Sequence, residues 1–202
     1  MQKAACSRRG RISGDSGSLD CESIGNCPVL NRYTVSRERM ANDLKNAQLL
    51  QGQRLAELLH DQYYFNEEKC LSDVGSLLWR SGEHQKVAMY LLSDGESVGA
   101  DESDLEPPTP FTLDAASFCS WRRENLLRNR SALFLEGKII TAVQGVVDKV
   151  AGGEVWLVGF QVAFETGDYL IYLNQGDDAV VLINEWPKRL EGIETCLVTS
   201  LE

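Results

Sequence analysis

Residues 154–164 read EVWLVGFQVAF, and the fold that the sequence predicts is built around them. Two sets of residues alternate along it with the period of a β-strand, and most of them are branched or aromatic. One set carries Gly159 and Gln161, whereas the other is wholly apolar. We therefore expect the apolar set, with its aromatic residues Trp156, Phe160 and Phe164, to face the core.

The flanking sequence predicts that this strand belongs to an antiparallel meander. Gly152 and Gly153 suit a two-residue hairpin turn that pairs residues 143–151 with 154–164. Residues 168–174 (DYLIYLN) alternate again, and a turn at 175–178 leads into residues 179–184. Residues 133–147 form either two strands with a tight turn or one long bulged strand, and 195–199 (TCLVT) supply a last strand.

The first half of the chain predicts helices. Residues 36–64 place apolar residues three and four apart, and Ser36 is a suitable N-cap. Residues 72–79 and 83–92 predict a helical hairpin around Gly82, and residues 113–129 predict a further helix. The predicted fold class is α+β, with N-terminal helices packed on a five to six stranded antiparallel β-meander.

Two polar segments lie outside these elements. Residues 1–35 are rich in Ser, Gly, Arg and Cys, and predict a disordered segment. Residues 93–110 (SDGESVGADESDLEPPTP) contain six acids, three prolines and no base, which predicts an acidic loop or linker. The chain thus divides into segment 1–35, a helical region at 36–92, the acidic loop, and a helix plus antiparallel sheet at 111–202. We expect residues 36–202 to form one domain.

Charge is distributed unevenly along the 202 residues, whose formal net charge is −10. Residues 1–39 hold seven Lys or Arg against four Asp or Glu, so the remaining residues carry −13. An acidic body repels nucleic acid and attracts cationic partners. We expect a cationic protein partner, of the toxin or effector class, and no nucleic acid.

The sequence also favours a cytoplasmic protein that does not enter a membrane. Its apolar runs are far shorter than the roughly 20 residues that span a bilayer. Residues 1–17 lack the apolar stretch of a secretory signal. In that compartment the six cysteines are expected to be reduced thiols.

Motifs for catalysis or cofactor binding are absent from the sequence. The cysteines have no zinc-ligand spacing, and His60 and His84 are expected on helix surfaces. We therefore predict no cofactor. The tryptophans are expected in the core, except that Trp186, beside Pro187, is a partly exposed interface anchor or a lid over the sheet edge.

The predicted hairpins bring carboxylates to the two ends of the sheet. Asp148, Glu154, Asp177 and Asp178 fall at one end, and the residues at the opposite end are Glu165, Asp168 and Glu185. They are solvated turn residues, since turns favour Asp and Gly, or they contact a partner, or they hold a divalent metal.

Arg122 and Arg123 lie in the second half of the predicted helix 113–129. Positive charge near a helix C-terminus is favourable by itself. The alternative is an anion-binding site, for a ligand or for the acidic loop with its residues Asp101, Glu102 and Asp104.

Two functions from different classes fit these features. The first is a non-enzymatic, acidic, cytosolic protein-binding domain of the immunity-protein or chaperone type, which neutralises or carries a cationic partner. The residues expected to bind that partner are Asp148, Glu154, Asp177, Asp178, Trp186, Asp101, Glu102 and Asp104. The second is a metal-dependent enzyme that uses the carboxylates at the end of the sheet, with Asp177 and Asp178 as the first candidates.

Overall fold

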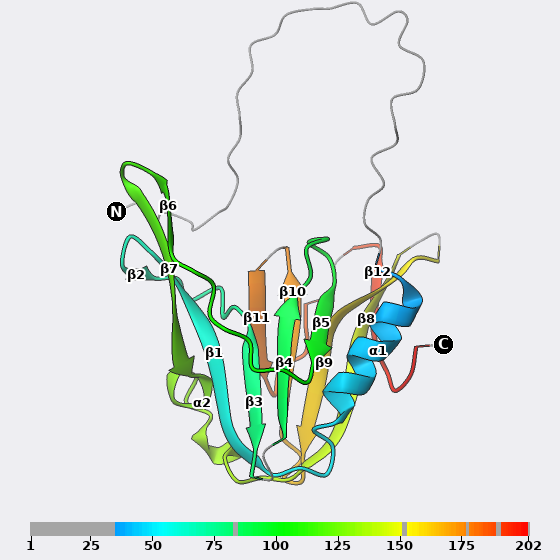
Figure 1. Cartoon of the computed structure of the whole chain (residues 1–202). Coiled ribbons are helices and arrows are strands. Elements are labelled where there is room, and N and C mark those ends of the chain that lie inside the picture. Colours follow the sequence, from blue (N-terminus) through cyan, green and yellow to red (C-terminus); the bar gives the residue numbers. More distant parts are fainter. Residues whose placement is uncertain (1–34, 83–84, 151–152, 177, 189–190, 202) are drawn as a thin grey trace, which may run out of the picture. The chain divides into compact units, whose positions relative to one another are not determined.

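The computed structural model describes residues 35–82, 85–150, 153–176, 178–188 and 191–201. Within these residues, twelve strands form two antiparallel sheets that pack face to face (Figure 1). The first sheet has the strand order β5-β4-β3-β1-β7-β6, with β2 paired to β1, and the second has the order β11-β10-β9-β8-β12.

The elements have the following bounds. The first sheet contains β1 (Leu55–Phe65), β2 (Glu68–Lys69), β3 (Leu77–Ser81), β4 (Lys86–Leu91), β5 (Val98–Asp101), β6 (Phe111–Asp114) and β7 (Ser117–Asn125). The second contains β8 (Ile140–Val150), β9 (Val155–Phe164), β10 (Tyr169–Gln175), β11 (Asp178–Ile183) and β12 (Ile193–Val198). The helical elements are α1 (Arg37–Gln48), the short α2 (Leu126–Asn129) and a 3-10 turn at Leu133–Leu135.

The main hydrophobic core lies between the two sheets. The first sheet contributes residues such as Leu58 and Trp79, and the second contributes Phe160 and Tyr172, all of them buried. The Nε1 of Trp79 donates to the sulfur of Met89 at 3.1 Å, so the indole N–H has a partner inside the core.

Helix α1 closes one open side of the two sheets (Figure 1). Ser36 is its N-cap and accepts from the amide of Arg39, as the sequence predicts. Asp43 is buried, and its Oδ1 accepts from the amide of Ala100 on the edge strand β5 at 3.1 Å. Gln48 donates to the carbonyl of Thr199, just beyond β12, at 2.9 Å. The helix therefore covers the edge of the first sheet and is tied to the second.

A loop between β2 and β3 closes the opposite side. The amide of Val74 donates to the carbonyl of Ala179 on β11 at 2.8 Å, and the hydroxyl of Tyr172 on β10 donates to the carbonyl of Gly75 at 3.1 Å. Gly75 has φ of +61°, and a Cβ there would lie 2.3 Å from the carbonyl oxygen of Asp61. Only glycine fits this close approach of the loop to β1.

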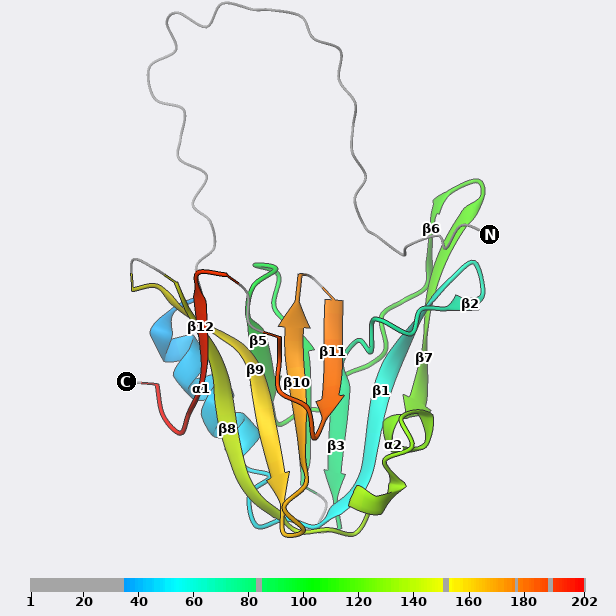
Figure 2. The same cartoon turned by 180° about the vertical axis from the view of Figure 1, so that it is seen from behind.

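Long connections cross the outer face of each sheet. Residues 102–110 join β5 to β6 at opposite edges of the first sheet, in front of β4 and β3 in Figure 1. The connection from β11 to β12 joins opposite edges of the second sheet, and its described residues, 184–188 and 191–192, cross the outer face of that sheet in Figure 2. Each sheet is therefore partly covered on the side that faces away from the main core.

The predicted α+β fold class is wrong, because most of the predicted helices are strands. The predicted helix 36–64 ends at Gln48, and its second half is β1. The described parts of the predicted helices 72–79 and 83–92 contain β3 and β4, which form a β-hairpin. The predicted helix 113–129 is mostly the hairpin β6-β7. The predicted loop 93–110 contains β5.

The predicted meander at the second half of the chain is confirmed. Strands β8, β9, β10 and β11 pair in chain order, and β12 supplies the expected last strand, paired to β8. Phe160 and Phe164 face the main core as predicted. Trp156 does not, and lies on the opposite face of β9. The predicted disordered segment 1–35 lies, apart from Val35, outside the described residues.

Candidate functional site

The outer face of the second sheet is apolar, although it faces away from the main core. Val146, Val158, Ile171 and Leu173 form a second buried cluster on this face. Partly buried side chains surround that cluster, namely Trp156, Tyr169, Val180, Leu182 and Leu197. An antiparallel sheet with one solvated face usually alternates apolar and polar residues. We call this set of side chains the outer apolar face.

A β-bulge places Trp156 on this face. On β8, Val146 and Val147 are adjacent, but their partners on β9 are Gly159 and Leu157, so Val158 is an extra residue. The extra residue reverses the alternation along β9. Leu157 and Phe160, three positions apart, therefore both face the main core, and Trp156 faces outward.

The connection from β11 to β12 contains a second tryptophan. Pro187 is buried, whereas the neighbouring Trp186 keeps 39% of its surface exposed. The predicted partial exposure of Trp186 is thus confirmed. Trp156 lies on the outer apolar face, and Trp186 is exposed in the connection from β11 to β12.

Three of the carboxylates predicted at one end of the sheet lie at the same end of the second sheet, around the outer apolar face. Asp148 is the cross-strand partner of Trp156 and accepts from the hydroxyl of Thr195 at 2.6 Å. Glu154 is exposed just before β9, and Asp178 begins β11. Asp177 lies outside the described residues. Because β8 and β11 are three strands apart, Asp148 and Asp178 are separated by about 14 Å across the sheet.

The carboxylates predicted at the opposite end are engaged in turns. Glu165 accepts from the amide of Ile139 at 3.1 Å. Asp168 accepts from Thr166 and from Asn184, and these two hydrogen bonds lower its pKa. Glu185 is exposed at the start of the connection. Acidic residues thus lie at both ends of the outer apolar face.

The acids of the predicted loop lie on the other sheet. Asp101 accepts from the hydroxyl of Tyr90 at 2.5 Å, and Asp104 pairs with Lys86 and Arg80. Glu102 is exposed. The predicted partner-binding residues therefore fall into two groups, one on each sheet, and do not form a single surface.

Arg122 and Arg123 lie on β7 and not on a helix. Arg123 donates to both carboxylate oxygens of the buried Asp61, at 3.0 and 3.2 Å, and also to the carbonyl of Leu105 in the connection 102–110. Arg122 pairs with Glu67 and lies over the ring of Tyr64. Both guanidinium groups thus have acidic partners within the chain, which leaves few of their N–H donors for an external anion.

Sequence reasoning missed a polar network on the inner side of β1 and β7. His60 is buried, contrary to the expected surface position, and hydrogen-bonds the carbonyl of Val74 through Nδ1 at 3.1 Å and Asn129 through Nε2 at 3.0 Å. Burial lowers the pKa of His60. Burial acts to raise the pKa of Glu124, but hydrogen bonds from Lys69, Tyr64 and Asn129 together lower it to about 2. These side chains satisfy one another, which is typical of a structural network.

Candidate metal ligands and thiols are scattered among the residues that the structure describes. No three His, Cys, Asp or Glu residues in that part of the chain could hold a metal ion together. Cys119 and Cys196 are free thiols, and Cys119 is buried, as is Cys70. His84 and the other three cysteines lie outside the described residues.

Comparisons of the chain with protein-family models, with curated proteins and with solved structures found no match. Among the described residues, α1 and α2 are both too short to cross a membrane. The interpretation of the outer apolar face therefore depends on its own geometry and charge.

Proposed function

We propose that this chain is a non-enzymatic protein-binding domain that docks a basic protein on the outer apolar face of its second sheet. The observation that carries the proposal is the apolar character of this face, on which Trp156 is only partly buried, together with the exposed Trp186 in the connection from β11 to β12. Exposed aromatic residues next to a buried apolar cluster are the usual anchors of protein interfaces.

The charge around this face selects the partner. Asp148, Glu154 and Asp178 lie at one end, and Asp168 and Glu185 at the other. Acids at the edge of an interface steer a partner with complementary positive charge and disfavour acidic ones. The partner is therefore a basic protein, and the domain neutralises or carries it, as immunity proteins and chaperones do.

We place this binding in the cytoplasm. Cys119 and Cys196 are free thiols in the described part of the chain. Free thiols are typical of a reducing compartment.

The test is affinity capture from the lysate of the source cells, at low and at high salt. The capturing chain is the wild type or the charge reversal Asp148→Lys/Glu154→Lys/Asp178→Lys. The matched control is Glu96→Lys/Glu102→Lys/Glu106→Lys, which changes the charge equally with exposed residues of the first sheet and its connections. Thermal unfolding of each variant verifies its fold.

We expect one basic protein to be captured at low salt by the wild type and by the control, and to be lost from the charge reversal on the second sheet. If only the control variant failed to capture the basic protein, the binding site would lie on the first sheet, which would contradict the proposal. Capture of no basic protein by the wild type would contradict it as well.

A further inference from the structure

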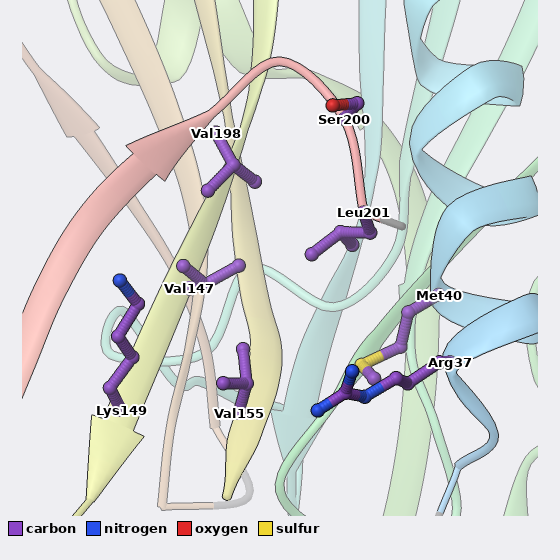
Figure 3. A pocket seen from close by; sticks show the side chains of 8 residues that line it. All are labelled: Arg37, Met40, Val147, Lys149, Val155, Val198, Ser200 and Leu201. Atoms are coloured by element: carbon purple, nitrogen blue, oxygen red, sulfur yellow. The ribbon is translucent and has the colours of Figure 1, made fainter. Parts of the chain in front are cut away.

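A hollow lies between α1, β8 and the end of β12, away from the outer apolar face. Its volume is about 200 Å³. Figure 3 shows the eight side chains that line it, which are Arg37, Met40, Val147, Lys149, Val155, Val198, Ser200 and Leu201.

The lining of this hollow is mainly aliphatic. Met40 on α1 and Val147 on β8 are buried at its base, and Val155, Val198 and Leu201 are half-buried around it. A ligand with an aliphatic chain would replace water against these side chains, which favours binding in proportion to the apolar area that is covered.

Two cationic side chains stand at the border of the hollow. Arg37 is the first residue of α1 and Lys149 is near the end of β8, and Figure 3 shows them on either side of Val155. Neither forms an ion pair with any residue that the structure describes, although Glu194 is the cross-strand partner of Lys149. Lys149 lies in residues 40–202, whose formal charge is −13, so a lysine beside an apolar hollow is a local exception there, whereas Arg37 belongs to the more basic residues 1–39.

We propose that this hollow binds a small amphipathic carboxylate, namely a fatty acid of short or medium chain length. The aliphatic chain lies on Met40 and Val147, and the carboxylate lies between the Arg37 guanidinium and the Lys149 ammonium. An arginine provides paired N–H donors for a carboxylate, and a lysine adds a point charge. The hollow is smaller than the roughly 300 to 1,000 Å³ of sites for drug-sized molecules, which favours a short ligand.

The first experiment measures the affinity of the full-length chain for butanoate, hexanoate, octanoate and decanoate by NMR titration of methyl-labelled protein. We expect the affinity to rise about fourfold for each methylene that enters the hollow, and to level off when the hollow is filled. The methyl signals of Met40 and Val198 should shift first. Affinity that rises without a limit, or shifts confined to residues outside the hollow, would indicate unspecific adsorption and overturn the proposal.

Head-group controls use octan-1-ol and octylamine. Both share the aliphatic chain, but the first is uncharged and the second is cationic. We expect at least tenfold weaker binding for each of them than for octanoate. Equal binding of octylamine would contradict the role of the two cations, and tight binding of a short peptide with a C-terminal leucine, without binding of octanoate, would overturn the assignment to a fatty acid.

The variant Arg37→Gln/Lys149→Gln removes both charges and keeps the aliphatic lining. It should weaken octanoate binding at least tenfold and leave the weak binding of octan-1-ol unchanged. The matched control is Lys45→Gln, an exposed lysine on the same helix that does not line the hollow. Unchanged octanoate affinity in the double variant would overturn the proposal, and the wild-type titration decides the question independently if that variant does not fold.

Discussion

At the scale of single residues, the position of Gly75 is the most restricted. Its positive φ and the 2.3 Å approach of a Cβ to the Asp61 carbonyl leave no space for a side chain. We expect Gly75→Ala to lower the free energy of unfolding by about 2 to 4 kcal/mol, because an alanine at this positive φ is strained and its Cβ clashes with the Asp61 carbonyl. Gly82→Ala is the control, since nothing lies within 4 Å of a Cβ there. Urea denaturation measures both, and an equal effect of the two substitutions would contradict the packing of this loop on β1.

Arg122 and Arg123 are neighbours in sequence, but the carboxylates that pair with them differ in burial. Asp61 is buried beside Arg123, whereas Glu67 is exposed beside Arg122. Arg123→Gln should cost about 3 to 5 kcal/mol of unfolding free energy, because it leaves a buried carboxylate without its cation. Arg122→Gln should cost about 1 kcal/mol or less.

The two arginine variants are compared by chemical denaturation. The double variant Asp61→Leu/Arg123→Met removes both charges and should recover most of the stability that Arg123→Gln loses. Equal effects of the two single arginine substitutions would show that the Asp61 pair is not buried.

At the scale of elements, the sequence predicts β8 to β11 correctly because their residues alternate and glycine-rich turns separate them. The sequence predicts a helix in place of β1, because a bulge lies between Leu55 and Glu57. The bulge puts the inward residues Leu55 and Leu58 three positions apart, which is helical spacing.

The sequence pattern predicts helices in place of β3 and β4 for a different reason. Both are buried on both faces, where Leu77, Leu78 and Trp79 give a continuous apolar run. Periodicity does not distinguish such a run from a buried helix. The connection 102–110 crosses the outer face of these strands and covers their second apolar side. This contact is a tertiary feature that local sequence does not show.

Helix α1 is expected to protect the edge of β5. Asp43→Ala removes the acceptor of the Ala100 amide and should lower the free energy of unfolding by about 1 to 3 kcal/mol. Hydrogen exchange at the Ala100 amide should become faster. Lys45→Ala, on the exposed side of the helix, is the control. Unchanged protection of Ala100 in Asp43→Ala would contradict the role of the helix as an edge cover.

At the scale of the whole molecule, His60 makes stability depend on pH. Burial holds its pKa below 6.5, so below that pH the unfolded chain binds a proton that the native protein excludes. Stability should therefore fall as pH drops from about 6.5, by up to about 1.4 kcal/mol per pH unit for one proton. The pKa of Glu124, about 2, adds a further loss that begins below about 4.5.

The test compares thermal unfolding between pH 7.5 and 5 for the wild type and His60→Gln. The variant does not titrate at this position, so its stability should change less over this range. If the stability of both proteins changed equally with pH, a group other than His60 would be responsible for the pH dependence.

The candidate binding surface could be predicted only in part. The meander places Asp148, Glu154 and Asp178 at one end of a sheet, and the sequence suffices for that. The outward position of Trp156 depends on the bulge at Val158, and the partition of the acids between two sheets depends on pairings in the first half of the chain. Neither follows from local patterns.

Site-specific photo-cross-linking in source cells tests whether the outer apolar face binds a basic protein. A photoreactive phenylalanine derivative replaces Trp156 on the second sheet or, as the control, Leu113, which is exposed on the first sheet. We expect a covalent product with one basic protein from position 156 and none from position 113. A product from position 113 alone, or none from position 156, would contradict the proposal.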